Sequence, residues 1–245
     1  MFPELTREEL AAGFDRVAAE ILAEARIDDP PVDAFLLAKR LGVAVARDDR
    51  QTGRARYVRL CGPGGRRPRA TILLRDEPRR ERRHWAVAHE IGEHVACRVF
   101  LELAVDPRET AANARELVAS QMAGRILLPT AWFVADAAAY GWDLTALKSR
   151  YRTASHELIA RRMLECRPAI IISIFDQQRL TWRRSNLPGR APPPSPAEMT
   201  CWRSVRQQRR PAQATAAAQV VQGWPVHEEG WWREILRTEV DEIAD

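Results

Sequence analysis

The stretch from residue 80 to residue 103 most constrains the fold, because it predicts one long helix that is apolar around much of its circumference. Pro78 cannot lie inside a helix, so the helix begins after it, near residues 80–83. The charged run RRERR stays at its start, and the residues that follow are mainly apolar: Ala86, Val87, Ala88, Ile91, Val95 and Ala96. We therefore expect this central helix to be largely buried.

The segments on either side predict an α+β fold. Thr6 and Glu9 have the form of a capping box, which starts a helix over about residues 6–25. A second helix follows Pro31 and ends at Gly42. The other expected elements are helices at 107–127, 131–139, 144–151 and 155–165 and strands at 43–46, 56–60, 71–74, 170–174 and 179–183. We expect a small twisted sheet packed against the central helix and its neighbours.

A proline-rich segment, NLPGRAPPPSP at residues 186–196, predicts an extended linker. It separates a main domain, residues 1–185 with the N-terminal helices of 1–42 included, from an extension, residues 197–245. Four of the eight tryptophans lie in this extension: Trp202, Trp224, Trp231 and Trp232. Because the extension is short and rich in aromatic surface, we expect it to pack on the main domain or on a partner.

Composition narrows the class of protein. The net charge of +5 comes mostly from arginine and forms no clustered basic face in the sequence, so we expect no direct nucleic-acid binding. The four cysteines form no C-x-x-C pair, which indicates reduced core thiols. The N-terminus has no apolar h-region, and no apolar run approaches the roughly 20 residues that span a bilayer. The sequence predicts a soluble, cytoplasmic protein without a membrane partner.

The central helix carries HWAVAHEIGEHV, residues 84–95, which differs from the zinc-peptidase signature H-E-x-x-H by one inserted residue. In the ordinary signature the two histidines bind zinc from one helix face, and the glutamate after the first takes a proton from the metal-bound water. Here His89 and His94 are five residues apart, so on an ideal helix their side chains diverge by roughly 140°.

Two arrangements can repair the spacing. A π-bulge, eased by Gly92, would return His94 to the face of His89. Alternatively the helix stays regular and Glu93, four residues after His89, takes the place of the second histidine. We favour the bulged arrangement, because imidazole is the commoner zinc ligand. In both arrangements Glu90 is the general base.

A third ligand is expected from the next helix. Glu116 lies 22 residues after His94, inside a segment whose apolar residues can face the core and bring it against the motif. An exposed helix carboxylate is the rival interpretation of Glu116, and Glu109 is the second candidate ligand. Three other residues are assigned no role at the metal: His84 is expected near the surface, His156 as a cap or packing residue, and Cys97 as a core thiol.

Four segments follow one another in an order typical of a known family: PPVDAFLLAKRLGVAV, RRHWAVAHEIGEHV, ELVASQMAGRILLP and RYRTASHELIARRML. Across roughly residues 15–185 the chain resembles the ImmA/IrrE family of zinc metallopeptidases. The resemblance implies a zincin-like domain with His89, His94 and Glu116 as zinc ligands and Glu90 as catalytic base. It also implies a regulatory peptidase that cuts a helix-turn-helix repressor and so controls transcription, in stress response or mobile-element transfer.

The contrasting hypothesis is a non-catalytic regulator that keeps the fold. Such a protein would hold zinc as a structural element and act through protein–protein interaction, with its tryptophan-rich extension as the binding surface. A structural zinc site closes its fourth position with a protein ligand, whereas a catalytic site leaves that position to water. A fourth ligand such as His156 or Cys97 would favour the regulator.

Overall fold

A computed structural model describes residues 5–61, 68–111, 113–166, 168–216, 219–228 and 230–240. The chain forms two compact units, one of residues 1–136 and 150–155 and the other of residues 137–149 and 156–245. The elements of the first part of the chain are α1 (Arg7–Glu24), α2 (Ala34–Arg40), β1 (Ala44–Arg47), β2 (Ala55–Leu60), β3 (Arg69–Leu74), α3 (Arg80–Glu102), η1 (Pro107–Glu109), α4 (Ala114–Leu127) and α5 (Thr130–Ala139). Those that follow are α6 (Leu144–Arg150), α7 (His156–Met163), β4 (Ile170–Asp176), β5 (Arg179–Ser185), α8 (Pro196–Gln208), β6 (Ala212–Ala216), β7 (Gln219–Pro225) and β8 (Arg233–Val240).

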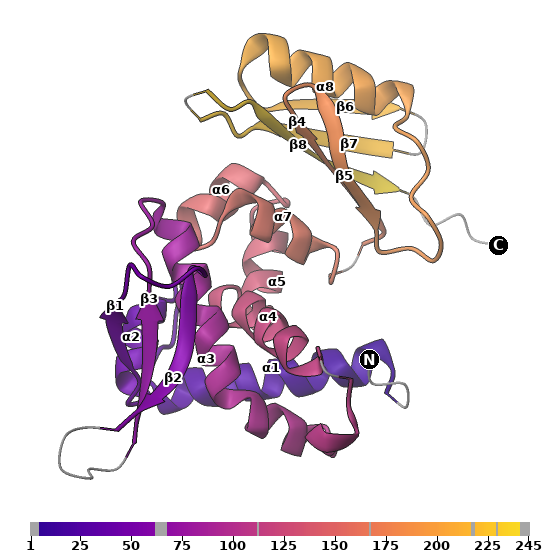
Figure 1. The fold of residues 1–245 in the computed structure, drawn as a ribbon. Coiled ribbons are helices and arrows are strands. Elements are labelled where there is room, and N and C mark those ends of the chain that lie inside the picture. The colour runs from indigo at the N-terminus through magenta and orange to yellow at the C-terminus, as the bar shows by residue number, and fades with distance from the viewer. Residues whose placement is uncertain are drawn as a thin grey trace. The chain divides into compact units, whose positions relative to one another are not determined.

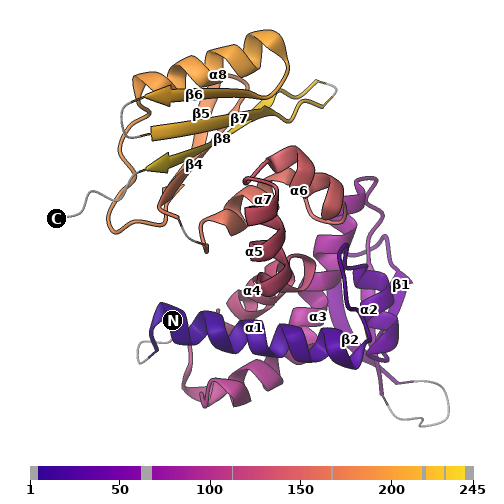
Figure 2. The same cartoon turned by 180° about the vertical axis from the view of Figure 1, so that it is seen from behind.

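The centre of the first unit is α3, as the sequence predicts. It contacts α1, α2 and α4 as well as strands β2 and β3, and its apolar side chains Val87, Ile91 and Val99 are fully buried. Figure 1 shows α3 between the small sheet and α4, and Figure 2 shows α1 running beside α4 from behind. The α+β class expected from the sequence is confirmed.

The small sheet of this unit has the strand order β1-β3-β2. Strand β1 is parallel to β3, whereas β2 is antiparallel to β3 and lies at the edge beside α3. In the β2–β3 register Tyr57 is opposite Ile72, and Ile72 is fully buried. The edge strand β2 therefore places its residues next to the helix that carries the histidine motif.

Local signals set most helix ends. Thr6 and Glu9 form both halves of the capping box that starts α1. The second helix begins later than its expected start after Pro31, because the Asp33 side chain caps it by accepting hydrogen bonds from two backbone N–H groups. The expected helix at 107–127 is also shorter, since Pro107 begins a separate 3-10 turn capped by Asp106, and α4 starts at residue 114.

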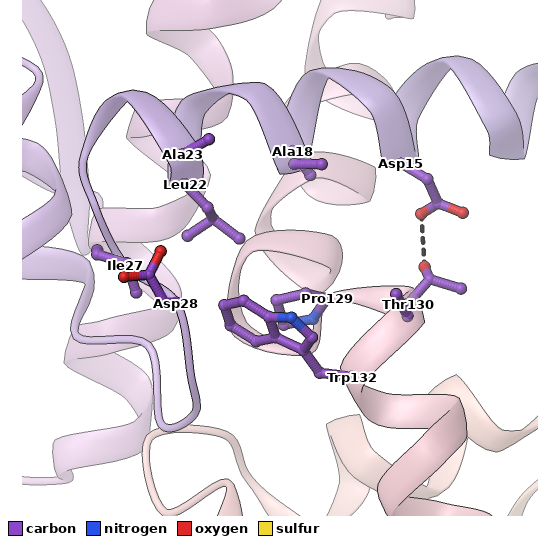
Figure 3. Close-up of a pocket in the computed structure, with 11 residues that line it drawn as sticks. Asp15, Ala18, Leu22, Ala23, Ile27, Asp28, Pro129, Thr130 and Trp132 are labelled. Carbon is purple, nitrogen blue, oxygen red and sulfur yellow. Dashed lines mark hydrogen bonds between the residues drawn. The ribbon is translucent and has the colours of Figure 1, made fainter.

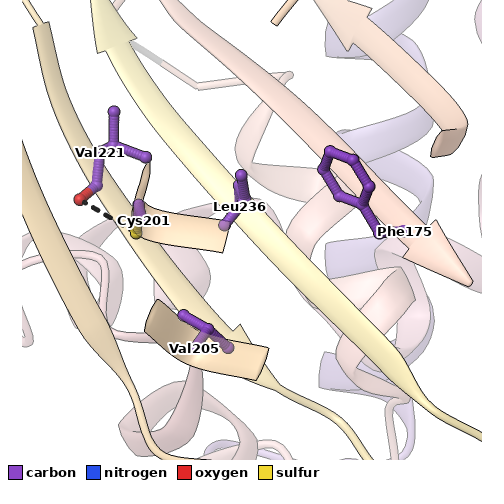
Figure 4. Packing of buried hydrophobic residues seen from close by; sticks show 5 residues of the cluster. All are labelled: Phe175, Cys201, Val205, Val221 and Leu236. Carbon is purple, nitrogen blue, oxygen red and sulfur yellow. Dashed lines mark hydrogen bonds between the residues drawn. The ribbon is translucent and has the colours of Figure 1, made fainter. Parts of the chain in front are cut away.

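The second unit is built on a five-stranded antiparallel sheet of order β5-β4-β8-β7-β6. Helix α8 packs on one face of this sheet around a buried cluster, shown in Figure 4, of Phe175, Cys201, Val205, Val221 and Leu236. Two polar contacts join this sheet to other parts of the same unit. The Trp224 indole N–H of β7 donates a 3.0 Å hydrogen bond to the Asp143 carboxylate, and Arg233 of β8 forms a 2.6 Å ion pair with Glu157 of α7. The extension after residue 196 therefore shares its sheet with β4 and β5.

This division differs from the expected boundary at residues 186–196, because strands from both sides of that segment pair with each other. Residues 186–195 connect β5 to α8 without regular secondary structure, as expected for an extended segment. The functional domains proposed from the sequence stay a prediction. Across the described residues no single helix is both long and apolar enough to cross a membrane; α4 and α5 pass that test only as a pair, across a bend of 48°.

Candidate metal centre

The motif residues of α3 meet α4 because the two helices approach closely at Gly92. A β-carbon at Gly92 would lie 2.7 Å from the Ala119 carbonyl oxygen and 2.8 Å from the Ala119 α-carbon. A real β-carbon is essentially never found this close to a non-bonded heavy atom, so a glycine permits the approach. Ala119 is one turn beyond Glu116 on α4, so the same approach brings Glu116 beside the motif.

His89 and Glu116 converge at this crossing. The His89 Nε2 lies 3.4 Å from a Glu116 carboxylate oxygen, and the exposed fractions of the two side chains are 17% and 69%. This separation is longer than an ordinary N–H···O hydrogen bond. It matches the spacing of two ligands on one tetrahedral zinc, which bonds of about 2.0–2.1 Å place roughly 3.3 Å apart. The two residues fit a shared metal ion that is reached from the surface.

Glu90 is next to this pair but is buried, with 8% of the residue exposed. One of its carboxylate oxygens accepts a 2.6 Å hydrogen bond from the backbone N–H of Tyr57 on β2. Burial raises the pKa of Glu90 above its usual value, and the charge of His89 and the Tyr57 N–H partly oppose that shift. The carboxylate is thus held in one orientation beside His89, as a proton acceptor in a metallopeptidase must be.

His94 faces the edge strand in this structure. Its Nδ1 lies 3.0 Å from the Tyr57 hydroxyl oxygen, and the two rings are tilted against each other. The pKa of His94 is lowered by burial and by the nearby charges of Arg98 and Arg59. The structure describes every residue of α3, and all of them are α-helical. The widened turn that would bring His94 to the face of His89 is therefore not formed. Its role as a ligand stays a prediction.

Glu93 lies on the same helix face as His89 but is engaged elsewhere. Its carboxylate forms an ion pair with Arg115 of α4, and the Arg115 guanidinium also donates to the Glu93 carbonyl over 3.0 Å. This pairing raises the pKa of Arg115. Glu93 can serve as a metal ligand only after Arg115 releases it.

The donor chemistry of the site suits zinc, but among the described residues two candidate donors, His89 and Glu116, lie together rather than three. Within the ranges that the structure describes, no three histidine, cysteine, aspartate or glutamate side chains are grouped closely enough to hold a metal. A catalytic zinc needs three protein ligands and an open position. For the motif to bind a catalytic zinc, the geometry around His94 or Glu93 would have to change locally.

The remaining sequence candidates differ in their burial and local contacts. Glu109, the second choice for the third ligand, is exposed on η1. His84 is buried, not near the surface as expected: it is 3% exposed, accepts a hydrogen bond from the Ala34 N–H over 3.3 Å and packs edge-on against Phe35. Of the expected core thiols, Cys166 and Cys201 are buried, whereas Cys61 and Cys97 are exposed.

Tyr57 and Arg115 are the site residues that sequence reasoning missed. Tyr57 contacts both Glu90 and His94, and Arg115 holds Glu93. Neither belongs to a motif, since each reaches the site through a pairing of elements far apart in the chain. An aromatic residue on one of the strands before a helix is too common a pattern to have indicated the contact of Tyr57 on β2 with α3.

Replacement of Gly92 by alanine tests whether the close helix crossing supports the site. We expect the Gly92→Ala variant to lose about 2–4 kcal/mol of unfolding free energy in chemical denaturation, because the new methyl group meets backbone atoms that cannot rotate away. Gly124→Ala on α4 is the matched control. Apart from its chain neighbours and the nearby backbone of its own helix, no described atom lies within 4 Å of the position that the new methyl group would take, so the control should be as stable as the wild type or up to about 1 kcal/mol more stable. Equal stability of the two variants would contradict the close crossing.

Comparison with known proteins adds the family. The family model described as Peptidase M78, IrrE N-terminal-like domain, matches residues 32–164. The chain belongs to the Peptidase M78 family. The M78 match spans α2 to α7 and so includes His89, Glu90, His94 and Glu116, and membership implies a metallopeptidase-like domain.

Structural comparison supports the fold beyond the M78 match. A solved structure described as a Mycobacterium tuberculosis transcriptional regulator superposes with a TM-score of 0.64 at 17% sequence identity. The similarity covers 92% of this chain and 75% of that chain, and at such low identity it shows the fold alone. No curated protein matches the sequence.

Proposed function

We propose that the chain is a zinc-dependent endopeptidase that regulates transcription by cleaving a helix-turn-helix repressor. The observation that carries the proposal is the convergence of His89 and Glu116 at 3.4 Å beside the buried carboxylate of Glu90. Membership of the Peptidase M78 family supports the same chemistry. His89 and Glu116 would hold the zinc, and His94 is proposed as the third ligand.

The roles of the protein groups follow from their positions. A zinc ion held by these residues would supply a water of lowered pKa and polarise the peptide carbonyl. Glu90 accepts the proton of the attacking water at its free carboxylate oxygen and later gives it to the leaving amine. The Tyr57 N–H fixes the other oxygen of Glu90, so the carboxylate does not have to be oriented when the substrate arrives.

His94 is the better candidate for the third ligand because its contact with Tyr57 suits a metal-bound histidine. A ligating imidazole commonly has its second nitrogen hydrogen-bonded to a fixed group, and the Tyr57 hydroxyl lies at Nδ1 of His94, which leaves Nε2 for the metal. One widened turn in α3 would bring that nitrogen toward His89. The alternative, Glu93, must first break its ion pair with Arg115.

The proposed substrate is a DNA-binding repressor, and the proposed location is the cytoplasm. The similar solved structure is described as a transcriptional regulator, which supports a role connected with gene regulation. Regulation under stress is proposed from the resemblance to the ImmA/IrrE family. The chain itself is not expected to bind nucleic acid directly, because its basic residues form no clustered basic face in the sequence.

Metal-dependent proteolysis of a whole proteome tests the function without knowledge of the substrate. Purified protein loaded with zinc is incubated with a bacterial extract, and newly formed N-termini are labelled and identified by mass spectrometry. We expect a small set of new N-termini that disappears, by at least about 100-fold in signal, when zinc is removed by a chelator and returns when zinc is restored. No zinc-dependent cleavage of any protein would contradict the proposal.

A second function is favoured by one observation, the absence of a three-ligand group among the described residues. On this alternative the protein is a non-catalytic regulator that binds its partner and uses any zinc structurally. Zinc X-ray absorption distinguishes the two functions, since a catalytic site shows three protein ligands and one water oxygen, whereas a structural site shows four protein ligands.

A further inference from the structure

A cavity lies in the first unit, between α1 and the start of α5. It has a volume of about 320 Å³ and is lined by Asp15, Ala18, Ala19, Leu22, Ala23, Ile27, Asp28, Pro129, Thr130, Ala131 and Trp132. Figure 3 shows Asp15 and Thr130 at one end, Ile27 and Asp28 at the other, and Pro129 and Trp132 between them. None of the residues of the metal centre lines it.

The walls of the cavity are apolar and mostly small. Three alanines of α1 and Leu22 form one side, and Pro129 and the half-buried Trp132 form the other. A volume near 320 Å³ is at the lower end of the range for small-molecule pockets. The cavity is therefore suited to one long side chain or a molecule of similar size rather than to a large cofactor.

The two carboxylates of the cavity differ in their partners. Asp15 is ion-paired with the buried Arg125 at 2.9 Å and accepts a 2.5 Å hydrogen bond from the Thr130 hydroxyl, so its charge is compensated. The Asp28 carboxylate is exposed, and among the described residues it forms no hydrogen bond or ion pair. One uncompensated negative charge thus remains at the end of an apolar cavity that also presents an indole ring.

We propose that this cavity binds an arginine or lysine side chain of a protein partner. The alkyl stem of such a side chain covers apolar surface while its cationic end stays near solvent, which matches the alanine wall and the exposed Asp28. The cation gains from Asp28 through charge and from Trp132 through its ring face. The proposal does not depend on zinc, because the cavity and the metal centre share no residue.

The test is a titration followed by the indole N–H signal of Trp132 in the NMR spectrum, assigned with the Trp132→Phe variant. The probes are N-acetyl-arginine amide and N-acetyl-citrulline amide, which have nearly the same shape but differ in charge. We expect a saturable shift with the arginine probe and binding at least about 5-fold weaker with the citrulline probe. Equal binding of the two probes, or no saturable shift with either, overturns the proposal.

Matched variants locate the charge. Asp28→Asn should lower the affinity for the arginine probe by about 5- to 10-fold. The neighbouring Asp29 is also exposed but does not line the cavity, so Asp29→Asn should change this affinity by less than about 2-fold. Equal effects of the two variants overturn the role of Asp28. His89→Ala should bind the probe as the wild type does, which separates this site from the metal centre.

The source of the cation is decided by comparing a five-residue alanine peptide with a central arginine against free agmatine. We expect the peptide to bind more tightly, because its backbone adds contacts at the mouth of the cavity where Ala19 and Ala23 are exposed. Agmatine binding as tightly as the peptide overturns the assignment to a protein partner and identifies a small amine as the ligand.

Discussion

Protein purified with zinc is expected to carry about one ion per chain, matching the single proposed site, and to lose most of it when either His89 or Glu116 is replaced by alanine. Each replacement removes one of the two donors that lie 3.4 Å apart, and the two proposed ligands that remain hold the ion too weakly to keep it during dialysis. We expect the affinity to fall by roughly 100-fold or more, since even residues that only support a metal ligand change affinity 10- to 100-fold. Metal content after dialysis, measured by mass spectrometry, gives the result.

The control for this experiment is Glu109→Gln, which changes an exposed carboxylate on η1 and should keep the zinc. Thermal unfolding of each variant shows whether it is folded. Glu116→Ala is informative in both directions because its side chain is largely exposed, so its replacement should not disturb the core. Full zinc retention in folded Glu116→Ala would restore the rival interpretation, an ordinary surface carboxylate.

The same measurement identifies the third ligand. If His94 binds the metal, His94→Ala loses zinc while Glu93→Gln keeps it, and Tyr57→Phe weakens binding by about 10-fold because the imidazole loses its hydrogen-bond partner. If Glu93 binds the metal, Glu93→Gln loses zinc while His94→Ala keeps it. In that case Arg115→Gln should tighten zinc binding, because it removes the cation that now occupies the Glu93 carboxylate.

Signals that act within a few residues predicted much of the fold. The capping box of Thr6 and Glu9, the helix-breaking Pro78 and the β-branched run of residues 170–174 each correspond to an element of the structure within a few residues of the expected bounds. The predicted start of the second helix was wrong because it was taken from Pro31, whereas the helix begins after the capping residue Asp33. Local sequence thus determines which elements form more reliably than where they begin.

Long-range pairing explains what the sequence did not predict. His84 is buried because α2 covers it, through the Ala34 N–H and the Phe35 ring, 50 residues away in the case of Ala34. Gly92, interpreted as a flexible residue that eases a bulge, permits the close contact with Ala119 instead. In each case the decisive neighbour belongs to another element, and its identity follows from the packing rather than from periodicity.

The same reason applies to the candidate site. The helix motif selected His89 and Glu90, the apolar pattern of the next helix selected Glu116, and the structure brings His89 and Glu116 together. The partners that decide whether His94 or Glu93 can join them, Tyr57 and Arg115, come from β2 and α4. The chemistry of the site stays a prediction from the sequence, while the competition among its possible ligands became visible only in the structure.

Glu90→Gln is expected to abolish proteolysis while it leaves the zinc content unchanged. The amide cannot accept a proton from water, so the general-base contribution of about 100- to 10,000-fold is lost. The glutamine oxygen can still accept the 2.6 Å hydrogen bond from the Tyr57 N–H, and the side chain has nearly the same volume. The geometry around His89 and Glu116 should therefore persist.

Two measurements on this variant separate catalysis from structure. Zinc content and unfolding free energy should equal those of the wild type, whereas the zinc-dependent new N-termini should fall to the level of the chelated protein. Loss of zinc together with activity would show that Glu90 supports the metal centre rather than the proton transfer. Full activity of the variant with zinc bound would exclude Glu90 as the general base. No other carboxylate of the described site is both buried and next to His89, so the proposed mechanism would then have no base.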